Sequence, residues 1–436
     1  MSMSPAEVAL ILFGTFIALV ILRVPVAFSL GLACVPVFFI SDRLTPSLLF
    51  DQMFRSYNSF VLLAVPFFLL AANLMNSAGI TQRLVNLSRV AVGHLPGGLG
   101  HINVLVSMLF AGISGSSTAD AAGIGSLLIP QMKKEGYDSS FAVAVTACSS
   151  VMGVVIPPSI LMVVWGGLMS VSIGGLFLAG ILPGLLIAAS MMGIVYIYAV
   201  RRGYPVYKRA SGREFLQALL GALLPLATPA IIIGGIVGGF FTPTEASVIA
   251  VIYSLILGMV VYRTITPRRL PVVLYDSARF AAISLFCIGT ASAFGWILAY
   301  FKIPQALVNE MATWGAGLTE TGILIALAFL IVGMFIDAIP AIIILGTVLY
   351  PVAQDVGMHP IHFAIIGVVS LAFGLVTPPY GLCLLIASAI GEIRMVQALR
   401  DVAIILSAMI AVLLFIILFP DAILALPRWL MPRFVG

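Results

Sequence analysis

The amino-acid sequence predicts an all-α polytopic membrane protein with about ten transmembrane crossings plus two re-entrant hairpins, arranged as two inverted repeats. Three observations lead to this fold class. Of the 436 residues, 62% are hydrophobic and 8% are charged, whereas about 25% are charged in soluble domains. Apolar runs long enough to cross a membrane recur along the chain. The two halves of the chain also share an internal repeat. A water-soluble fold is excluded, because so few charged side chains cannot cover a soluble surface.

Charge and cysteine content exclude several other classes of protein. The net charge of +5 comes from only 21 Lys and Arg residues, so it fits a membrane charge bias better than nucleic-acid binding. The cysteines lie inside apolar stretches without the spacing of a zinc or redox motif, at Cys34, Cys148, Cys287 and Cys383. The histidines also lack metal-site spacing, and no phosphate-binding loop or nucleophile elbow is present. We therefore expect no enzymatic activity and no organic cofactor.

The crossings follow from the length of the apolar runs. A bilayer core of about 30 Å needs roughly 20 apolar residues, and most runs are apolar throughout, so they predict helices rather than a β-barrel. The first run follows Glu7 instead of a basic segment, which favours a retained helix over a signal peptide. Thr242 to Glu245 form a capping box that starts the seventh crossing. The predicted crossings are 4–22, 26–41, 57–79, 138–170, 176–200, 216–239, 245–262, 277–300, 360–390 and 402–420.

Two stretches, 97–131 and 318–350, are too long for one crossing and are interrupted by polar or acidic residues. We interpret both as hairpins that enter and leave on the same side. With Arg23 in the cytoplasm, this choice places 16 of the 21 basic residues inside, which obeys the positive-inside rule. Both chain ends are then predicted to be periplasmic. The five basic residues left outside are Arg43, Arg55, Lys302, Arg428 and Arg433.

An offset of 221 residues aligns 112–161 with 333–382 without a gap. Eleven positions are identical, and seven of them are Gly or Pro, which impose particular backbone geometry. In the predicted topology the first hairpin opens from the cytoplasm and the second from outside, so the copies are inverted. Inverted repeats around a midplane site are typical of secondary transporters. The seven pairs are Gly112/Gly333, Gly125/Gly346, Pro130/Pro351, Gly136/Gly357, Gly153/Gly374, Pro157/Pro378 and Pro158/Pro379.

The middle of the first hairpin, 112–120, is rich in small and hydroxyl residues. Small residues allow two backbone arms to approach closely, and hydroxyl and carbonyl oxygens are suitable ligands for a cation. This tip therefore indicates a site for Na⁺ or for a carboxylate. The alternative is a tight helix contact in which the serines bond only to backbone carbonyls.

Each hairpin is followed by a crossing with two adjacent prolines, at 153–159 and 374–380. Adjacent prolines remove amide donors, so each helix must break and leave carbonyls unpaired. A bound cation would satisfy these carbonyls, and the half-helix N-termini would favour an anionic substrate group. The alternative is a packing kink satisfied by hydroxyls such as those of Ser159 and Thr377.

Two acidic residues, Asp120 and Asp337, lie at or near the hairpin tips. Carboxylates at membrane depth indicate ion ligands or proton carriers. A capped turn is the simplest alternative for either residue. A pair of membrane aspartates could also form an intramembrane protease dyad. The sequence argues against it, since Met334-Phe335-Ile336 precedes Asp337 and Asp120 lies in a Ser-rich loop.

With these motifs in place, the chain resembles the large membrane subunit of tripartite ATP-independent periplasmic (TRAP) transporters, in the ion transporter superfamily, over essentially its full length. One departure is Ala72, where such proteins commonly carry Gly. The matching segments are Val65-Pro66-Phe67-Phe68, Asn73-Leu74-Met75, Ser114-Gly115-Ser116-Ser117, Ile156-Pro157-Pro158-Ser159, Phe241-Thr242-Pro243-Thr244-Glu245-Ala246 and Thr377-Pro378-Pro379.

The resemblance implies sodium-coupled import of an organic acid across the bacterial inner membrane by an elevator-type movement. It also implies two partners, which are a periplasmic solute-binding protein and a small membrane subunit of about four helices, expected here as a separate chain. A proton-coupled organic-anion transporter or a channel is the alternative.

These arguments predict two sets of site residues. We expect Na⁺ to be bound by Ser114, Ser116, Ser117, Gly153, Val155, Pro157, Gly333, Asp337, Gly374, Thr377 and Pro378. We expect the substrate to contact Ser116, Thr118, Asp120, Ser159, Thr377 and Tyr380. The expected domains are scaffold helices in 1–56, a first repeat in 57–175, scaffold helices and basic loops in 176–276, a second repeat in 277–392 and a C-terminal helix in 393–436.

Overall fold

The computed structural model describes residues 4–40, 44–313 and 315–432, without the side chain of Ala312. Every regular element in these ranges is helical, which confirms the predicted all-α class. Arg43, Arg433 and the C-terminal residue Gly436, whose sides of the membrane were predicted, lie outside the described residues.

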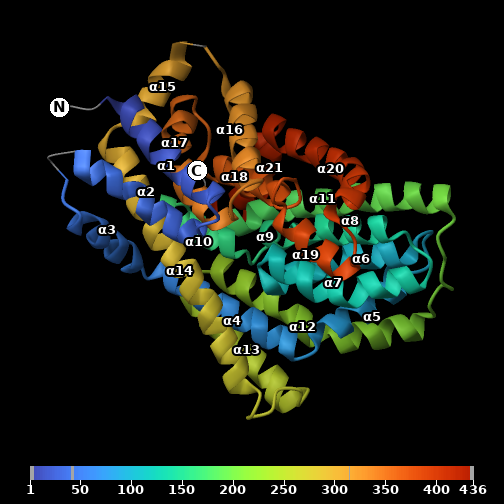
Figure 1. The fold of residues 1–436 in the computed structure, drawn as a ribbon. Helices are drawn as coiled ribbons and strands as arrows, with labels where there is room; N and C mark the ends of the chain where they lie inside the picture. Colours follow the sequence, from blue (N-terminus) through green and yellow to red (C-terminus); the bar gives the residue numbers. More distant parts are fainter. Residues whose placement is uncertain (1–3, 41–43, 314, 433–436) are drawn as a thin grey trace.

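The helices follow one another closely along the chain (Figure 1). A 3₁₀ turn, η1 (Val61–Leu63), precedes α4, and a π-helical segment, η2 (Ile256–Val261), extends α13. The α-helices are α1 (Pro5–Ile21), α2 (Val26–Ile40), α3 (Ser47–Tyr57), α4 (Ala64–Ser77), α5 (Ile80–Val92), α6 (Gly98–Ser114), α7 (Ser117–Lys134), α8 (Ser139–Ser150), α9 (Met152–Val155), α10 (Ile160–Met169), α11 (Ile173–Arg202), α12 (Gly212–Val237), α13 (Pro243–Leu255), α14 (Leu270–Tyr300), α15 (Ile303–Thr313), α16 (Leu318–Gly333), α17 (Ala338–Asp355), α18 (Pro360–Gly374), α19 (Leu382–Gly391), α20 (Met395–Leu418) and α21 (Pro420–Leu430).

Within the described residues, seven helical stretches are long and apolar enough to cross a membrane, or eight if one bent pair is a single span. The bent pair changes a predicted boundary. Helix α3 meets the segment Val61–Ser77 at an angle of 74°, so the predicted crossing 57–79 does not begin as a straight helix at residue 57. Asn58 leaves the helical region, with ψ at 49°, and both Asn58 and Ser59 are weak helix formers.

Four short helices were not predicted, namely α3, α5, α15 and α21. Each has 11 to 13 residues and polar residues among the apolar ones. They were missed because a search for apolar runs of about 20 residues passes over short amphipathic helices.

Both predicted hairpins are present. Helices α6 and α7 meet at Gly115, which has a φ of 63°, and α16 and α17 meet across residues 334–337. The bounds of α7 and α17 differ by the predicted 221 residues at both ends. Each is followed by a glycine with positive φ, Gly136 and Gly357. Both double prolines contain a cis peptide bond, Pro157-Pro158 and Pro378-Pro379.

The same offset relates elements outside the aligned segment. It matches α5 to α15 and α11 to α20 within a few residues. It also matches α1 to the end of α12, and α2 to most of α13 together with η2. The duplicated unit in the structure is therefore longer than the segment in which the sequence alone shows it.

The two copies pack across each other. Helix α4 of the first copy packs on α13, and α14 of the second copy packs on α2. Helix α7 packs on α19, and α17 packs on α10. A Cβ on Gly125 would lie 3.2 Å from Ile390, and a Cβ on Gly346 would lie 2.7 Å from Met169. Since Met169 and Ile390 are also 221 residues apart, each hairpin packs on the second half-helix of the other copy.

Several basic clusters that were predicted to be cytoplasmic lie together. Arg202 pairs with Asp138 at 2.7 Å and with the buried Asp401 at 2.9 Å, which joins α11, the start of α8 and α20. Lys133 Nζ donates to the Gly391 carbonyl at 3.0 Å, close to Arg394.

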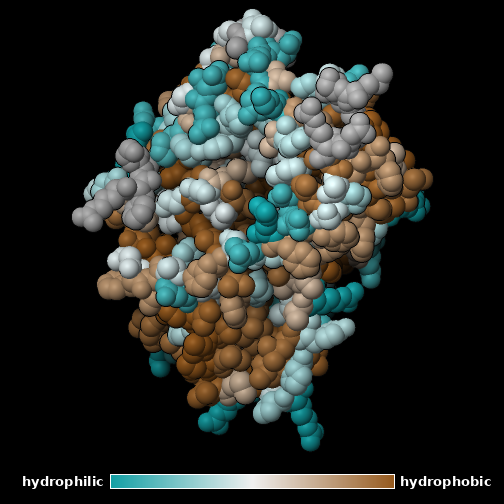
Figure 2. Space-filling view, turned by 90° about the vertical axis from the view of Figure 1, so that its left-hand side faces the viewer, coloured by the Kyte–Doolittle hydropathy of each residue, from teal (hydrophilic) through white to brown (hydrophobic). Residues whose placement is uncertain are grey.

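In Figure 1 the loop after α13 lies at the bottom of the view, whereas α15 lies at the upper left. Figure 2 shows a broad hydrophobic area with hydrophilic side chains above and below it.

Candidate functional site

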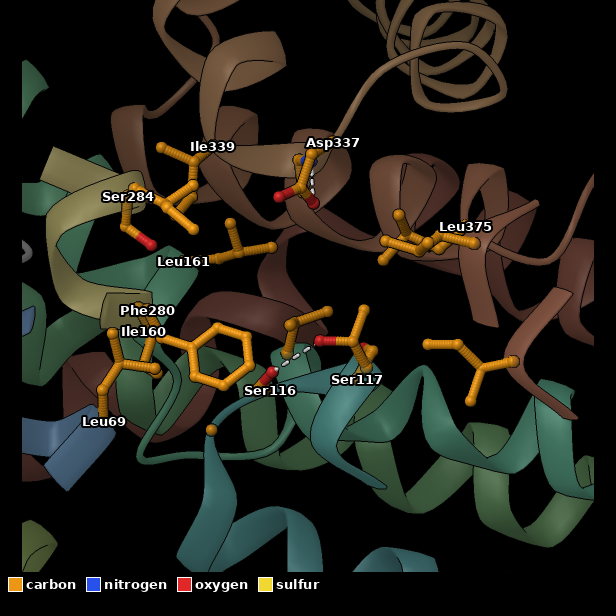
Figure 3. A pocket seen from close by; sticks show the side chains of 17 residues that line it. Leu69, Ser116, Ser117, Ile160, Leu161, Phe280, Ser284, Asp337, Ile339 and Leu375 are labelled. Carbon is orange, nitrogen blue, oxygen red and sulfur yellow. Dashed lines mark hydrogen bonds between the residues drawn. The ribbon is translucent and has the colours of Figure 1, made fainter. Parts of the chain in front are cut away.

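A cavity of about 360 Å³ lies where both hairpin tips and both helix breaks meet (Figure 3). The first tip contributes Gly115 to Thr118, and the second contributes Asp337 to Ile339. The two broken helices contribute apolar side chains on either side of each break. Helices α4 and α14 close the cavity with Leu69, Phe280, Ile283 and Ser284.

The first tip presents hydroxyl groups at the start of α7. Ser116 caps this helix, and its Oγ accepts a hydrogen bond from the Ala119 amide at 3.5 Å. The hydroxyls of Ser116 and Thr118 are 3.2 Å apart. Ser117 Oγ donates to the Val151 carbonyl at 3.3 Å, which connects the tip to the first broken helix. The tip is thus a polar edge of a mostly apolar cavity.

The first break is closed by local hydrogen bonds. Ser159 caps α10, and its Oγ donates to the Val154 carbonyl at 2.6 Å. The Ile160 amide donates to the Gly115 carbonyl at 3.3 Å, which joins the break to the hairpin tip. Ser159 is buried and does not line the cavity. In this structure its hydroxyl satisfies a carbonyl that the helix break leaves without a backbone partner.

The second tip places Asp337 at the start of α17. Its Oδ1 accepts a hydrogen bond from the Ala338 amide at 2.8 Å, and the side chain is exposed to the cavity. Figure 3 shows Asp337 on one side of the cavity and Ser116 and Ser117 on the other. Asp337 is the one charged side chain among the described residues that line the cavity.

The second break repeats the first with different groups. The Leu375 carbonyl, equivalent to that of Val154, accepts from the Cys383 amide at 2.9 Å. The Tyr380 amide donates to the Met334 carbonyl at 3.2 Å. Thr377 Oγ1 donates to the Phe373 carbonyl at 2.7 Å. Neither Thr377 nor Tyr380 lines the cavity in this structure.

Four helices begin at the cavity, because residues at or near the starts of α7, α10, α17 and α19 line it. The first amides of a helix have no partner within the helix, and the helix dipole is positive at this end. Four such ends around one cavity make its electrostatic potential favourable for an anion. Asp337 offsets part of this potential on its own side.

Asp120 lies behind the first tip instead of in the cavity. It is fully buried, and one carboxylate oxygen accepts a hydrogen bond from Ser114. The other oxygen, Oδ2, has no hydrogen-bond partner among the described residues. A Cβ on Gly153 would lie 2.5 Å from this oxygen and 2.9 Å from the Ser116 carbonyl oxygen. A buried, unpaired carboxylate oxygen beside a carbonyl is an arrangement that suits a cation.

The second copy differs here, because Gly374, the equivalent of Gly153, faces Gly333, which is the equivalent of Gly112. A Cβ on Gly374 would lie 2.6 Å from the carbonyl carbon of Gly333, so α16 and α18 touch through their backbones. The carbonyls of Val155 and Pro157, which were also predicted to bind Na⁺, face different helices. The Val155 carbonyl faces Gly180 of α11, and the Pro157 carbonyl faces Gly112 of α6.

The cavity wall formed by α4 and α14 was not predicted. Phe280, Ile283 and Ser284 lie in a stretch predicted only as a crossing, and Leu69 lies in another. Their place at the site depends on tertiary packing, and no local motif marks them. Within the described ranges, no group of three or more His, Cys, Asp or Glu residues is arranged to hold a metal ion.

Comparisons with known proteins agree with this architecture. A family model described as the DctM component of tripartite ATP-independent periplasmic transporters matches residues 13–422. The chain is 39% identical to the sialic acid TRAP transporter large permease SiaM of Vibrio cholerae, over 96% of this chain and 97% of that protein. It is 36% identical to the C4-dicarboxylate TRAP transporter large permease DctM of Pseudomonas aeruginosa, over 87% and 89%.

Two further comparisons concern chain length and fold. The isethionate TRAP transporter permease DctMQ of Oleidesulfovibrio alaskensis is 38% identical over 93% of this chain but only 64% of its own length. The solved Alcanivorax borkumensis YdaH transporter shares the fold, with a TM-score of 0.62 at 15% identity over 86% of this chain and 88% of that one. The present chain therefore belongs to the family of TRAP transporter large permeases, and it is a multi-pass membrane transport subunit, not an enzyme.

Proposed function

We propose that this chain forms the translocation pathway of a sodium-coupled importer of an organic anion in the bacterial inner membrane. The observation that carries the proposal is the cavity where two hairpin tips, two helix breaks and four helix N-termini converge. An anionic group would bind at the start of α7, beside the hydroxyls of Ser116, Ser117 and Thr118. The other organic groups of the solute would contact the apolar wall.

The residues behind the first tip suit a sodium ion. Asp120 offers an unpaired, buried oxygen next to the Ser116 carbonyl, and the Ser114 hydroxyl is already bonded to the same carboxylate. Oxygen donors of this kind are those that hard cations prefer. We therefore assign Asp120 to the ion rather than to the substrate. Asp337 and the backbone around Gly333, Gly374, Thr377 and Pro378 would form the second ion site.

Sodium would couple to the anion by neutralising charge near the cavity. A cation at Asp120 lies directly behind the tip whose amides face the substrate, so it would increase the positive potential there. The same buried oxygen could carry a proton instead, which makes proton coupling the second candidate. The two candidates differ in the cation gradient that drives uptake.

The two copies would exchange shapes during transport. Both ends of the chain are proposed to be periplasmic, so the copies are inverted and the hairpins open on opposite sides. We propose that hairpins and broken helices move as an elevator against the remaining helices. A separate small membrane subunit and a periplasmic binding protein would complete the system. The greater length of the isethionate relative, whose name joins two subunit letters, supports a second membrane component.

The test is uptake into proteoliposomes that contain this chain, its small subunit and its binding protein. An inward Na⁺ gradient should drive accumulation, and replacing Na⁺ by K⁺ should abolish it. Equal uptake with a proton gradient alone would refute sodium coupling. Ser117→Ala should reduce uptake, whereas Ser126→Ala on the same helix, whose hydroxyl bonds only to the Gly123 carbonyl at 2.9 Å, should not.

A further inference from the structure

The chemistry of the cavity wall is uneven. The polar side chains are the three hydroxyls at the start of α7, Ser284 and Asp337, and the remaining side chains are aliphatic or aromatic. No Lys, Arg or His is among the described residues that line the cavity. Positive potential therefore comes from helix N-termini, each equivalent to roughly half a unit charge. This positive potential is enough to hold one anionic group.

The place for a second anionic group is unfavourable. On the side of the cavity opposite Ser116 and Ser117 stands the Asp337 carboxylate (Figure 3). A second carboxylate on the solute would meet either this charge or the apolar wall, and both positions are costly for an anion. A sodium ion on Asp337 would cancel the charge there without leaving a net positive one.

Helix α14 supplies an apolar part of the cavity wall. Phe280 is 58% exposed and Ile283 is 57% exposed, and both line the cavity. Figure 3 shows the Phe280 ring beside Ile160, projecting toward Ser116. At the other end of the cavity, Leu375, Leu382 and Ile386 continue the apolar lining. An anion held at the first tip would therefore extend its body over apolar surface.

We infer that the solute is a monoanion with an apolar body, and that Phe280 of α14 selects for that body. The inference rests on the proposed function and narrows its substrate class. A second carboxylate or many hydroxyl groups on the solute would find few partners on this wall, whose polar side chains are three hydroxyls at the start of α7, Ser284 and Asp337. The cavity of about 360 Å³ is at the small end of the range for ligand sites.

The experiment measures binding of a homologous series to the purified chain with its small subunit in lipid nanodiscs. Propionate, butanoate, pentanoate and hexanoate are titrated in NaCl and in choline chloride, with the thermal unfolding midpoint as readout. Each added methylene should tighten binding by roughly fourfold until the cavity is full. In adipate a carboxylate replaces the terminal methyl group of hexanoate. Adipate should therefore bind at least about tenfold more weakly than hexanoate.

Two variants on α14 locate the selectivity. Phe280→Ala should weaken hexanoate binding by about tenfold or more and should weaken propionate binding less, since the longer chain covers more of the ring. Phe280→Leu keeps an apolar side chain and should retain most of the length dependence, which covers the case in which the alanine variant fails to fold. The matched control is Phe286→Ala, because Phe286 packs against Phe28 at 5.0 Å outside the cavity.

The outcomes separate the inference from the function on which it rests. Sodium-dependent binding with no dependence on chain length, or adipate binding as tightly as hexanoate, would overturn the inference and leave anion import standing. Equal effects of Phe280→Ala and Phe286→Ala would remove the role of Phe280. Absence of sodium-dependent binding for every anion in the series would contradict both proposals.

Discussion

The contact between Gly333 and Gly374 gives the sharpest prediction about the second ion site. In Gly374→Ala, the new Cβ would lie 2.6 Å from the carbonyl carbon, 2.7 Å from Cα and 3.0 Å from the carbonyl oxygen of Gly333. These are backbone atoms, so no side chain can rotate away. Restoring an ordinary contact of 3.4 Å requires α16 and α18 to separate by about 0.8 Å.

This separation should affect ion binding more than stability. Inserting a methyl group into a packed interior costs about 1–3 kcal/mol, which a folded permease can tolerate. Metal-ligand distances hold to within about 0.2 Å, so a shift of about 0.8 Å is too large for a preformed site. We expect Gly374→Ala to fold with a lower unfolding midpoint and to require a much higher Na⁺ concentration for transport.

The assay is a sodium titration of uptake and of thermal unfolding, with Gly193→Ala as the matched control. Gly193 lies inside α11, and no atom beyond the nearby backbone of this helix lies within 4 Å of the position that a Cβ would take there. Alanine should therefore be neutral or stabilising by up to about 1 kcal/mol. If Gly374→Ala keeps both the midpoint and the sodium dependence of the unmodified chain, the proposed backbone contact does not set the site.

Three further perturbations test other parts of the structure. Asp401→Ala removes the buried acceptor to which Ser140, Tyr198 and Arg202 donate, and it should lower the free energy of unfolding by about 3 kcal/mol. Loss of the exposed ion pair of Asp421 should change it by about 1 kcal/mol or less, and denaturant titrations would measure both effects. Asp120→Asn should weaken sodium activation of uptake by at least about tenfold; an unchanged sodium titration would remove Asp120 from the ion site. Burial raises the pKa of Tyr137 to about 12, so folding keeps its hydroxyl protonated, and the stability this provides is complete below pH 10 and is lost as the pH rises toward 12. Tyr137→Phe removes the hydroxyl that accepts a hydrogen bond from the Leu99 amide, so the variant should be less stable than the unmodified chain at pH 8. This difference in stability should shrink above pH 10. Unfolding midpoints measured as a function of pH would test both expectations.

Much of the fold could be predicted because its signals are local. Apolar length reveals long helices such as α11 and α20, and paired prolines reveal the breaks at Pro157 and Pro378. The repeat was visible where glycine and proline fix the backbone, but it disappears from the sequence in α5 and α15, where only helix positions are kept. Many different apolar and polar residues can pack at these positions, so the two helices keep the same place in the fold without sequence identity.

The candidate site was less accessible to prediction. The hydroxyls of Ser116 and Ser117 and the carboxylate of Asp337 stand out at membrane depth, and all three line the cavity. Phe280 does not stand out, because one phenylalanine in an apolar helix carries no signal of what it faces. Asp120 was predicted to meet substrate, but whether a carboxylate faces a cavity or lies behind a tip depends on helix rotation, which spacing alone leaves open.

The cross-packing of α7 on α19 and of α17 on α10 has a consequence for biogenesis. During synthesis, α7 is complete about 250 residues before α19. The face of α7 that packs on α19 therefore has no partner until α19 has been made. Until then that face can be covered only by lipid, by chaperones or by other parts of the first copy. Neither copy expressed alone would bury this face, and the complete cavity would form only after α19, which ends at Gly391, had been inserted.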